Sequence, residues 1–227
     1  MNQTLIKWYI EHLQTCFKMA ENKQSKIDNF IKTMEGMTGE KTRHFYNNLL
    51  TIPDCRYLEI GSWVGSSVCS GMCHNNATVL CVDNWSEFEG PKEEFISNFE
   101  QYKGTNDATF IESNCWDLDV QKIGKFNVFL YDGDHKEYAH YRALPFFMDC
   151  LDDIFIYIVD DWNWECVRSP TLASIKDMKM EVLWEKEIRL TLDGSHTPDP
   201  KLAKSTWHNG IYVCLLQQRK QLEKLSL

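Results

Sequence analysis

The chain has 227 residues, of which 33 are Asp or Glu and 24 are Lys or Arg, so its formal net charge is −9. A hydrophobic content of 43% can form a large core, which excludes a disordered chain, and the length fits a single α/β domain. The negative charge argues against nucleic acid or an anionic membrane surface as the main partner, because both attract clusters of Lys and Arg.

Location in the cell can also be addressed from composition. No apolar run approaches the roughly 18 residues of a membrane span, and residues 1–10 lack the apolar core of a signal peptide. The nine cysteines are odd in number and scattered, whereas disulfide scaffolds are usually short and even-numbered. Cys69 and Cys73 have no second pair at metal-ligand spacing, which argues against a zinc site. We expect reduced thiols and a cytoplasmic protein.

Residues 1–50 are predicted to be helical. A second helical run, residues 42–50, follows a turn at 36–39. The apolar face of residues 5–17 predicts either a lid, a homodimer contact or a contact to a further domain. That face is formed by Leu5, Trp8, Tyr9, Leu13 and Cys16.

Five short runs of β-branched and aromatic residues come next, with helical segments between them. They are continuously apolar, which is typical of parallel strands buried on both faces. Two further runs, separated only by a loop, predict an antiparallel hairpin. The pattern therefore predicts an α/β fold: a Rossmann-like doubly wound sheet with five parallel strands, a C-terminal antiparallel hairpin and N-terminal helices. The runs are 56–60, 78–82, 109–111, 126–131 and 154–159, then 181–191 and 210–217.

Ligands of such sheets bind at the carboxyl ends of the strands. The first strand leads into the segment 59–67, EIGSWVGSS, where Gly61 permits a turn that exposes backbone N–H groups and Gly65 permits close approach of the next helix. A dinucleotide site would have G-x-G-x-x-G, but Trp63 stands at its second glycine, which disfavours NAD. An ordinary strand-to-helix turn is the alternative interpretation of this motif alone.

Acidic residues recur at the ends of the other predicted strands. Asp83 ends the second strand, about 20 residues beyond the glycine turn, where an acid can bind ribose hydroxyls. The segment 112–117 after the third strand has short polar groups and an aromatic face suited to adenine. The fourth and fifth strands lead into 131–135, YDGDH, and 160–164, DDWNW. This recurrence predicts an acidic pocket that binds a cationic ligand.

These motifs together resemble the class I S-adenosylmethionine-dependent methyltransferases over residues 40–217. The segment 59–65 is similar to the family motif E/D-x-G-x-x-x-G, and Asp83 matches its ribose-binding acid. The segments 132–135 and 159–161 resemble small sugar O-methyltransferases of the macrocin and aminocoumarin type. The segment 36–48 adds a resemblance to glycan methyltransferases of large algal DNA viruses, the chloroviruses. The aromatic insertion at 162–164 and the lack of Gly-Gly before the fifth strand depart from the sugar-enzyme pattern.

The resemblance implies methyl transfer from S-adenosyl-L-methionine to a sugar hydroxyl, with a deoxyhexose such as rhamnose in a viral glycan as the expected acceptor. A catechol-like or other small-molecule hydroxyl is the alternative within the class. A nucleotide-dependent oxidoreductase or a non-catalytic binding module is the alternative outside it. We expect a helical extension or lid at 1–50, the methyltransferase domain at 51–220 and a tail at 221–227. For a viral protein, the expected location is the host cytoplasm.

The resemblance also implies which residues hold the cofactor. Arg43 would pair with its carboxylate, although a solvated helix face is the alternative for this residue, and Trp116 would serve either the adenine or the core. The full predicted set is Arg43, Glu59, Gly61, Ser62, Trp63, Gly65, Ser66, Asp83, Asn84, Trp85, Ser113, Cys115, Trp116 and Asp132.

Asp132, Asp160 and Asp161 resemble the three-acid site of the Mg²⁺-dependent branch, where Mn²⁺ can stand in for Mg²⁺. The ion would lower the pKa of the acceptor hydroxyl and orient it. Because adjacent side chains of a strand point to opposite faces, Asp160 and Asp161 can share an ion only if the strand ends there. The alternative is that one of them caps the next helix.

Asp134 and His135 are the candidate bases beside Asp132, and Asp134 is preferred because the related sugar enzymes have an acid there. A solvated turn is the alternative for His135. Aromatic rings suit the apolar faces of a sugar, so the acceptor side is predicted to include Trp162, Trp164, Trp207 and His208. A hairpin turn is the alternative for 207–209.

Overall fold

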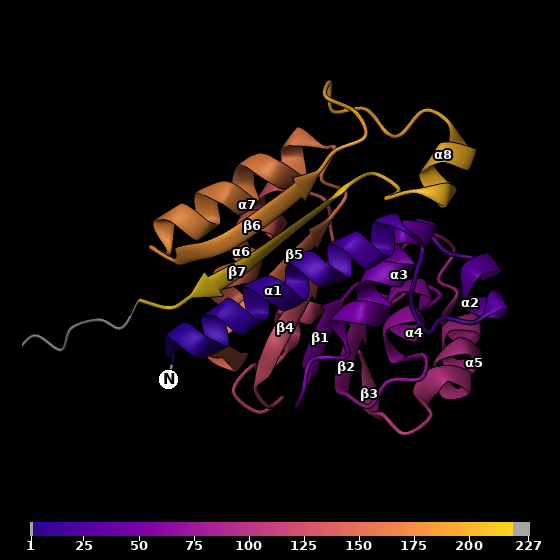
Figure 1. Ribbon diagram of the computed structural model, residues 1–227, viewed down its shortest axis with the longest axis horizontal. Helices are drawn as coiled ribbons and strands as arrows, with labels where there is room; N and C mark the ends of the chain where they lie inside the picture. Colours follow the sequence, from indigo (N-terminus) through magenta and orange to yellow (C-terminus); the bar gives the residue numbers. More distant parts are fainter. Residues whose placement is uncertain (1, 220–227) are drawn as a thin grey trace, which may run out of the picture.

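The computed structural model describes residues 2–219, and the predicted tail at 221–227 lies outside them. These residues form one seven-stranded sheet in the order β3-β2-β1-β4-β5-β7-β6 (Figure 1). The first five strands are parallel, and β7 pairs antiparallel with both β5 and β6, which confirms the predicted fold class. The strands are β1 (Arg56–Ile60), β2 (Thr78–Asp83), β3 (Asp107–Glu112), β4 (Phe126–Tyr131), β5 (Leu151–Asp160), β6 (Glu181–Ile188) and β7 (Ile211–Gln217).

The strand order reverses between β1 and β4. The chain runs outward from β1 to β2 and β3, then returns to pair β4 with the other edge of β1. In doubly wound sheets the crevice outside the carboxyl ends at this switch point binds ligands. The topology therefore places the turns after β1 and β4 at the centre of the candidate site.

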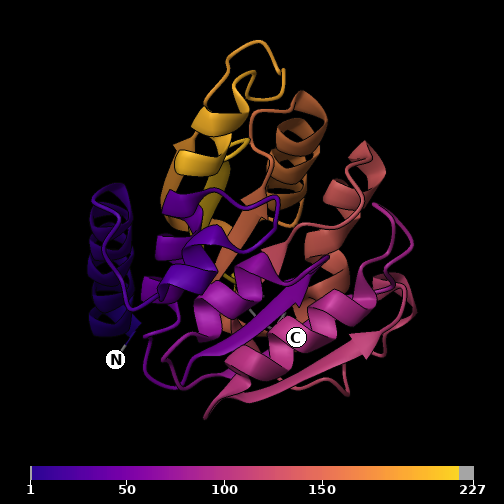
Figure 2. The same ribbon diagram turned by 90° about the vertical axis from the view of Figure 1, so that its right-hand side faces the viewer.

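Helices cover both faces of the sheet (Figures 1 and 2). Successive residues of β1 divide between them: Tyr57 packs with the helical layer of α1, α3, α4 and α5, and Leu58 packs with α6 and α7. This division explains why the parallel strands are continuously apolar. The helices are α1 (Asn2–Glu21), α2 (Asn29–Thr33), α3 (Glu40–Leu49), α4 (Ser66–Met72), α5 (Lys92–Lys103), α6 (Glu137–Phe147), α7 (Glu165–Asp177) and α8 (Pro200–Ser205).

The predicted apolar face of α1 is buried only in part. Leu13 and Cys16 are buried, and Phe17 packs its ring 4.5 Å from that of Phe45 on α3. Leu5 and Trp8, nearer the amino end, remain 43% and 36% exposed. None of the helices within residues 2–219 combines the length and the hydropathy of a membrane-spanning segment.

The C-terminal hairpin differs from its prediction at one end. β6 ends at Ile188, three residues earlier than predicted. The backbone N–H groups of Leu190 and Thr191 donate to Asn163 Oδ1 at 2.8 and 3.3 Å instead of to a strand. The chain is thereby diverted into the long connection 189–210, which lies at the carboxyl end of the sheet with α8 (Figure 1).

The connection 189–210 is attached to the start of α3. Lys41 N donates to Thr206 O at 3.0 Å. Gly39 lies so close that a Cβ atom there would be 2.3 Å from Thr206 O, so a larger residue would push the two segments apart. The connection thus forms a fixed wall above the carboxyl ends of the parallel strands.

Candidate functional site

A cavity of about 650 Å³ lies at the carboxyl ends of β1 to β5, a size typical of small-molecule sites. Its central edge is the turn after β1. Gly61 has a φ of 85°, and a Cβ atom there would lie 2.0 Å from Asp132 O. Only glycine therefore lets the β1 turn run directly beside the end of β4.

Asp83 joins two loops at the cavity edge. Its Oδ2 accepts hydrogen bonds from the backbone N–H of Ser62 at 2.7 Å and of Trp63 at 2.9 Å. Its Oδ1 accepts from Trp85 N at 2.7 Å. A carboxylate has about four lone-pair sites, so Asp83 can still accept from a ligand hydroxyl.

The two tryptophans of these loops brace each other. Trp85 Nε1 donates to Trp63 O at 2.8 Å, and Trp63 Nε1 donates to Phe88 O at 3.0 Å. Both indoles line the cavity, as do Asn84 and Phe88. Because both indole N–H groups are used within the protein, these rings offer a ligand their faces only.

Glu59 does not line the cavity. It is fully buried and accepts from Tyr57 Oη at 2.6 Å and from the hydroxyls of Ser62 and Ser67 at 2.8 Å each. Burial raises the pKa of Glu59 to about 7, although the three hydrogen bonds oppose the rise. Glu59, predicted to bind the cofactor, thus holds the glycine turn from beneath.

Of the two neighbours Gly65 and Ser66, both predicted to bind the cofactor, only Ser66 lines the cavity. Gly65, with a φ of 89°, stands at the N-cap of α4, where a Cβ atom would lie 3.2 Å from the ring of Phe95. It permits helix packing and is not a lining residue, whereas Ser66 lines the cavity beside Thr38, to whose hydroxyl it is hydrogen-bonded at 2.8 Å.

The predicted adenine side also lies on the cavity. Ser113, Cys115 and Trp116 all line it, together with Asn114. Asn114 Oδ1 accepts from Trp116 N at 3.1 Å, and the guanidinium of Arg142 lies 4.5 Å from the centre of the Trp116 ring. This packing fixes the ring at the cavity wall while leaving it partly exposed.

Arg43 is not at the cavity, which corrects its predicted contact with the cofactor. It is 4% exposed, and its guanidinium donates to the carbonyl groups of Ile31, Met34 and Thr38. Burial lowers the pKa of Arg43 to about 10. Its Nε and Nη1 groups donate to these carbonyl groups, so the guanidinium is held within the protein and away from a ligand in the cavity. Arg43 instead shapes the loop whose Met37 and Thr38 line the cavity.

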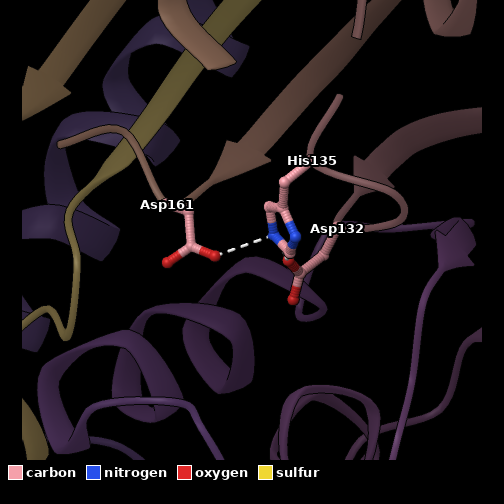
Figure 3. Close-up of side chains that lie close together, drawn as sticks. All are labelled: Asp132, His135 and Asp161. Atoms are coloured by element: carbon pink, nitrogen blue, oxygen red, sulfur yellow. Dashed lines mark ion pairs between the residues drawn. The ribbon is translucent and has the colours of Figure 1, made fainter. Parts of the chain in front are cut away.

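Three side chains meet on the cavity floor: Asp132, His135 and Asp161 (Figure 3). His135 Nε2 lies 2.8 Å from Asp161 Oδ2 and 3.7 Å from Asp132 Oδ1. The three donor atoms all lie within 4.8 Å of one another. The arrangement combines one imidazole with two carboxylates at the ends of β4 and β5.

Asp160 does not join this group, although it was predicted to share an ion with Asp132 and Asp161. Its Oδ1 accepts from Asp161 N at 3.0 Å, and Asp161 takes the left-handed conformation with a φ of 55°. Burial, with the carboxylates of Asp132 and Asp161, raises the pKa of Asp160 well above its usual range. Asp160 still reaches the cavity surface, but the predicted three-acid set does not come together around one point.

The charges of the group depend on one another. Burial raises the pKa of Asp132 to about 6. Burial acts in the same direction on Asp161, but His135 outweighs it and lowers the pKa of that carboxyl. For His135 burial disfavours the charged form, yet the carboxylates of Asp132 and Asp161 raise its pKa to about 11. In the absence of another cation, the imidazolium offsets part of the negative charge of this acidic floor.

Asp134 lies at the cavity rim and is held by hydrogen bonds. Its carboxylate accepts from Lys136 N at 3.1 Å, Lys136 Nζ at 3.0 Å and Tyr138 Oη at 3.1 Å. Although burial acts the other way, these bonds lower the pKa of Asp134. The residue is therefore positioned as an anionic proton acceptor of modest basicity.

The predicted acceptor residues divide into two pairs. Trp164 and His208 line the cavity. Trp162 and Trp207 do not, which corrects their prediction: Trp162 is fully buried and stacks on Tyr212 at 4.3 Å, with its indole N–H donating to Glu187 at 2.9 Å. Trp207 is 2% exposed and donates to Glu21 of α1 at 2.7 Å. Both belong to the packing beneath the cavity wall.

Sequence reasoning missed several lining residues. His196 is the most informative, because its ring lies 4.6 Å from Trp164, which in turn lies 5.0 Å from His135. A connection between two antiparallel neighbours begins and ends at the same edge of the sheet. The prediction of an antiparallel hairpin therefore already implied that the segment 189–210, which contains His196, lies at the edge where the cavity is. The missed lining residues include Met37, Thr38, Glu87, Phe88, Tyr138, His196 and Thr197.

No protein-family profile matches the chain, and no curated protein matches it in sequence. Several solved structures are similar in fold. A Klebsiella pneumoniae protein assigned as an O-methyltransferase has a TM-score of 0.55 and 12% identity over 95% of each chain. Cofactor-bound Rv0187 from MTB has a TM-score of 0.56 and 10% identity over 92% of this chain and 91% of its own.

A third similar structure is SMU.776, a protein assigned as a methyltransferase and complexed with SAH. It has a TM-score of 0.53 and 8% identity over 81% of this chain, which spans 50% of that protein. At sequence identities this low, the TM-scores show that the fold is shared and nothing more specific. The chain therefore has the Rossmann-like fold found in these methyltransferase structures.

Proposed function

We propose that the chain transfers a methyl group from S-adenosylmethionine to a hydroxyl group of a sugar. The acidity of the cavity carries this proposal: among the described residues, six acids line it, whereas its cationic side chains are limited to the imidazolium of His135, with no Lys or Arg. The sulfonium of S-adenosylmethionine is a cation, which such a cavity attracts, whereas it repels the pyrophosphate of NAD. The six acids are Asp83, Glu87, Asp132, Asp134, Asp160 and Asp161.

The residues at the β1 turn suit this cofactor. Asp83 keeps acceptor capacity for a ribose diol, and Gly61 brings the backbone of β1 against β4. The segment 113–116 supplies polar atoms and one aromatic face for an adenine. Trp63 stands where a dinucleotide turn has its second glycine, with its N–H already donated to Phe88, so it obstructs the path of a pyrophosphate.

The acceptor would lie under the wall formed by the connection 189–210. Trp164, His196 and His208 line that side of the cavity. An indole face suits the apolar face of a sugar ring, and imidazole nitrogens can bind its hydroxyls. This combination supports a sugar acceptor, and a deoxyhexose such as rhamnose is our specific proposal.

The reaction is an in-line displacement. The acceptor oxygen attacks the methyl carbon, the carbon–sulfur bond breaks, and its electron pair remains on sulfur to give S-adenosylhomocysteine. The hydroxyl proton passes to a base, for which we propose Asp134 at the cavity rim. Most of the rate would come from holding sulfonium and hydroxyl in line. The set Asp132, Asp160 and Asp161 does not fit the predicted Mg²⁺ site, because Asp160 is turned beneath the Asp161 amide.

Incubation with S-adenosylmethionine labelled in its methyl group tests the proposal. Rhamnosides, other hexosides and catechols are offered in parallel, and products are analysed by mass spectrometry for the added methyl group. We expect label in a glycoside. Label in catechols alone would contradict the sugar acceptor, and S-adenosylhomocysteine binding without any transfer would contradict catalysis.

A further inference from the structure

His135 lies close to two carboxylates without forming a hydrogen bond of normal geometry to either of them. His135 Nε2 is only 2.8 Å from Asp161 Oδ2, yet this buried nitrogen has no hydrogen-bond partner among the described residues. The N–H direction of the ring therefore does not meet the carboxylate oxygen, although the distance would suit a hydrogen bond. Donor atoms that lie this close without a hydrogen bond between them can act as ligands of one metal ion.

The separations also suit ligands of one ion. Two ligands at right angles on a metal, each about 2.1 Å from it, lie about 3.0 Å apart. The measured separations from His135 Nε2 are 2.8 Å to Asp161 and 3.7 Å to Asp132. Small adjustments of Asp132, whose side chain is 30% exposed, would bring all three onto one face of an ion.

We propose that Asp132, His135 and Asp161 bind a divalent transition metal such as Mn²⁺, Fe²⁺ or Co²⁺ in preference to Mg²⁺. One imidazole with two carboxylates on one face is a mixed nitrogen and oxygen donor set. Imidazole binds transition metals well, whereas Mg²⁺ prefers oxygen ligands and retains its waters. The predicted set of three aspartates would have favoured Mg²⁺, so the exchange of Asp160 for His135 changes which ion the site selects.

Asp160 acts as a positioning residue in this arrangement. By accepting from Asp161 N at 3.0 Å, it holds Asp161 in the left-handed conformation that turns the Asp161 carboxylate toward His135. Asparagine could provide the same acceptor oxygen, so Asp160→Asn should leave the three ligands in place.

The inference deepens the proposed function, since the ion would lie where the acceptor hydroxyl binds, but its test does not depend on turnover. The whole chain is treated with EDTA, freed of chelator and titrated with Mn²⁺ while the electron paramagnetic resonance signal of free Mn²⁺ is followed. Competition with Mg²⁺ gives the preference between the ions. Each sample is also titrated with S-adenosylhomocysteine.

We expect one Mn²⁺ per chain, displaced only by a large excess of Mg²⁺. His135→Ala should weaken Mn²⁺ binding at least tenfold, while Asp160→Asn, the matched control, should retain it. His135→Gln keeps a ligand of similar length but replaces nitrogen by oxygen, so it should narrow the preference for Mn²⁺ over Mg²⁺. It serves as the second variant if His135→Ala does not fold.

Three results would overturn the inference: no Mn²⁺ binding, equal affinity for Mg²⁺, or Mn²⁺ binding that is as tight in His135→Ala as in the natural chain. S-Adenosylhomocysteine binding without Mn²⁺ binding would refute the metal site and leave methyl transfer standing. Mn²⁺ binding without S-adenosylhomocysteine binding would refute the proposed function and leave the metal site standing.

Discussion

Glu59 and Asp83 hold the same glycine turn from two sides, and their surroundings give them different properties. Asp83 accepts backbone N–H groups at the cavity edge, whereas Glu59 is fully enclosed and accepts three hydroxyls. The position of Asp83 at a strand end predicted its place, because the carboxyl ends of parallel strands meet at one edge. Glu59 also stands near a strand end, but a sequence does not show which side of the turn its carboxylate occupies.

Asp83→Asn should weaken S-adenosylhomocysteine binding. The substitution removes the charge and one acceptor oxygen, and a hydrogen bond to a charged group contributes about 1.5–3 kcal/mol, so affinity should fall roughly tenfold or more. Calorimetric titration at fixed salt measures the change. Asp107→Asn, at the opposite end of the neighbouring strand β3, is the matched control and should bind normally. Equal affinities of the two variants would contradict the ribose assignment.

Glu59→Gln should change how stability depends on pH. The pKa of Glu59 is raised by burial to about 7 from 4.5, so the folded state favours the protonated acid. This contribution is fully present below about pH 4.5 and is lost as the pH rises through about 7, which amounts to about 3 kcal/mol. Glutamine does not titrate, so the variant should gain stability relative to the natural chain as the pH rises.

Chemical denaturation of both chains between pH 4.5 and pH 8 measures this difference for Glu59→Gln. Subtracting one curve from the other removes the pH dependence of the remaining groups. A difference in unfolding free energy that stays constant over this range would show that the Glu59 carboxyl is already ionised at the low end.

The turn after β5 places one tryptophan, Trp162, in the core and another, Trp164, on the cavity surface. Trp162 is stacked on Tyr212 beneath the cavity wall, and Trp164 lies on the cavity surface. The separation arises because Asp161 takes the left-handed conformation, which ends the regular alternation of the strand. Sequence patterns give side-chain alternation within a strand, but they do not give the direction of a residue after such a turn.

Trp162→Ala and Trp164→Ala should therefore behave differently. Removal of the buried indole should lower the free energy of unfolding by about 3–5 kcal/mol, whereas Trp164→Ala should cost about 1 kcal/mol or less. Trp164→Ala should instead raise KM for the acceptor. Denaturant unfolding compares the two, and a larger loss of stability in Trp164→Ala would contradict the assignment of Trp164 to the acceptor side.

Other elements show what sequence patterns capture and what they miss. The ranges of β1 and β4 were predicted to the residue, because strands buried on both faces are continuous apolar runs. Arg43 and Trp207 were placed in the site by residue type, although their partners, carbonyl groups of residues 31–38 and Glu21 of α1, come from elements that meet only in the fold. His196 was missed because it lies far from any predicted strand end in the sequence, and only the long connection 189–210 brings it to the cavity.

At the scale of the molecule, part of the excess negative charge lies at the cavity where the strand order reverses. Six of the 33 acids line one cavity, and within residues 2–219 no Lys or Arg lines it with them. The turns after β1 and β4 lie side by side because the strand order reverses there. A charge of −9 therefore indicates which ligands the pocket attracts as well as which partners the surface repels.

Calorimetric titration of the whole chain with S-adenosylhomocysteine and, separately, with NAD is the most direct test of this account. S-Adenosylhomocysteine shares the adenosine and amino acid parts of the proposed cofactor, and NAD has the pyrophosphate that the acidic cavity should repel. We predict saturable binding of S-adenosylhomocysteine at one site per chain and no measurable binding of NAD. Binding of NAD with no binding of S-adenosylhomocysteine would contradict the central claim.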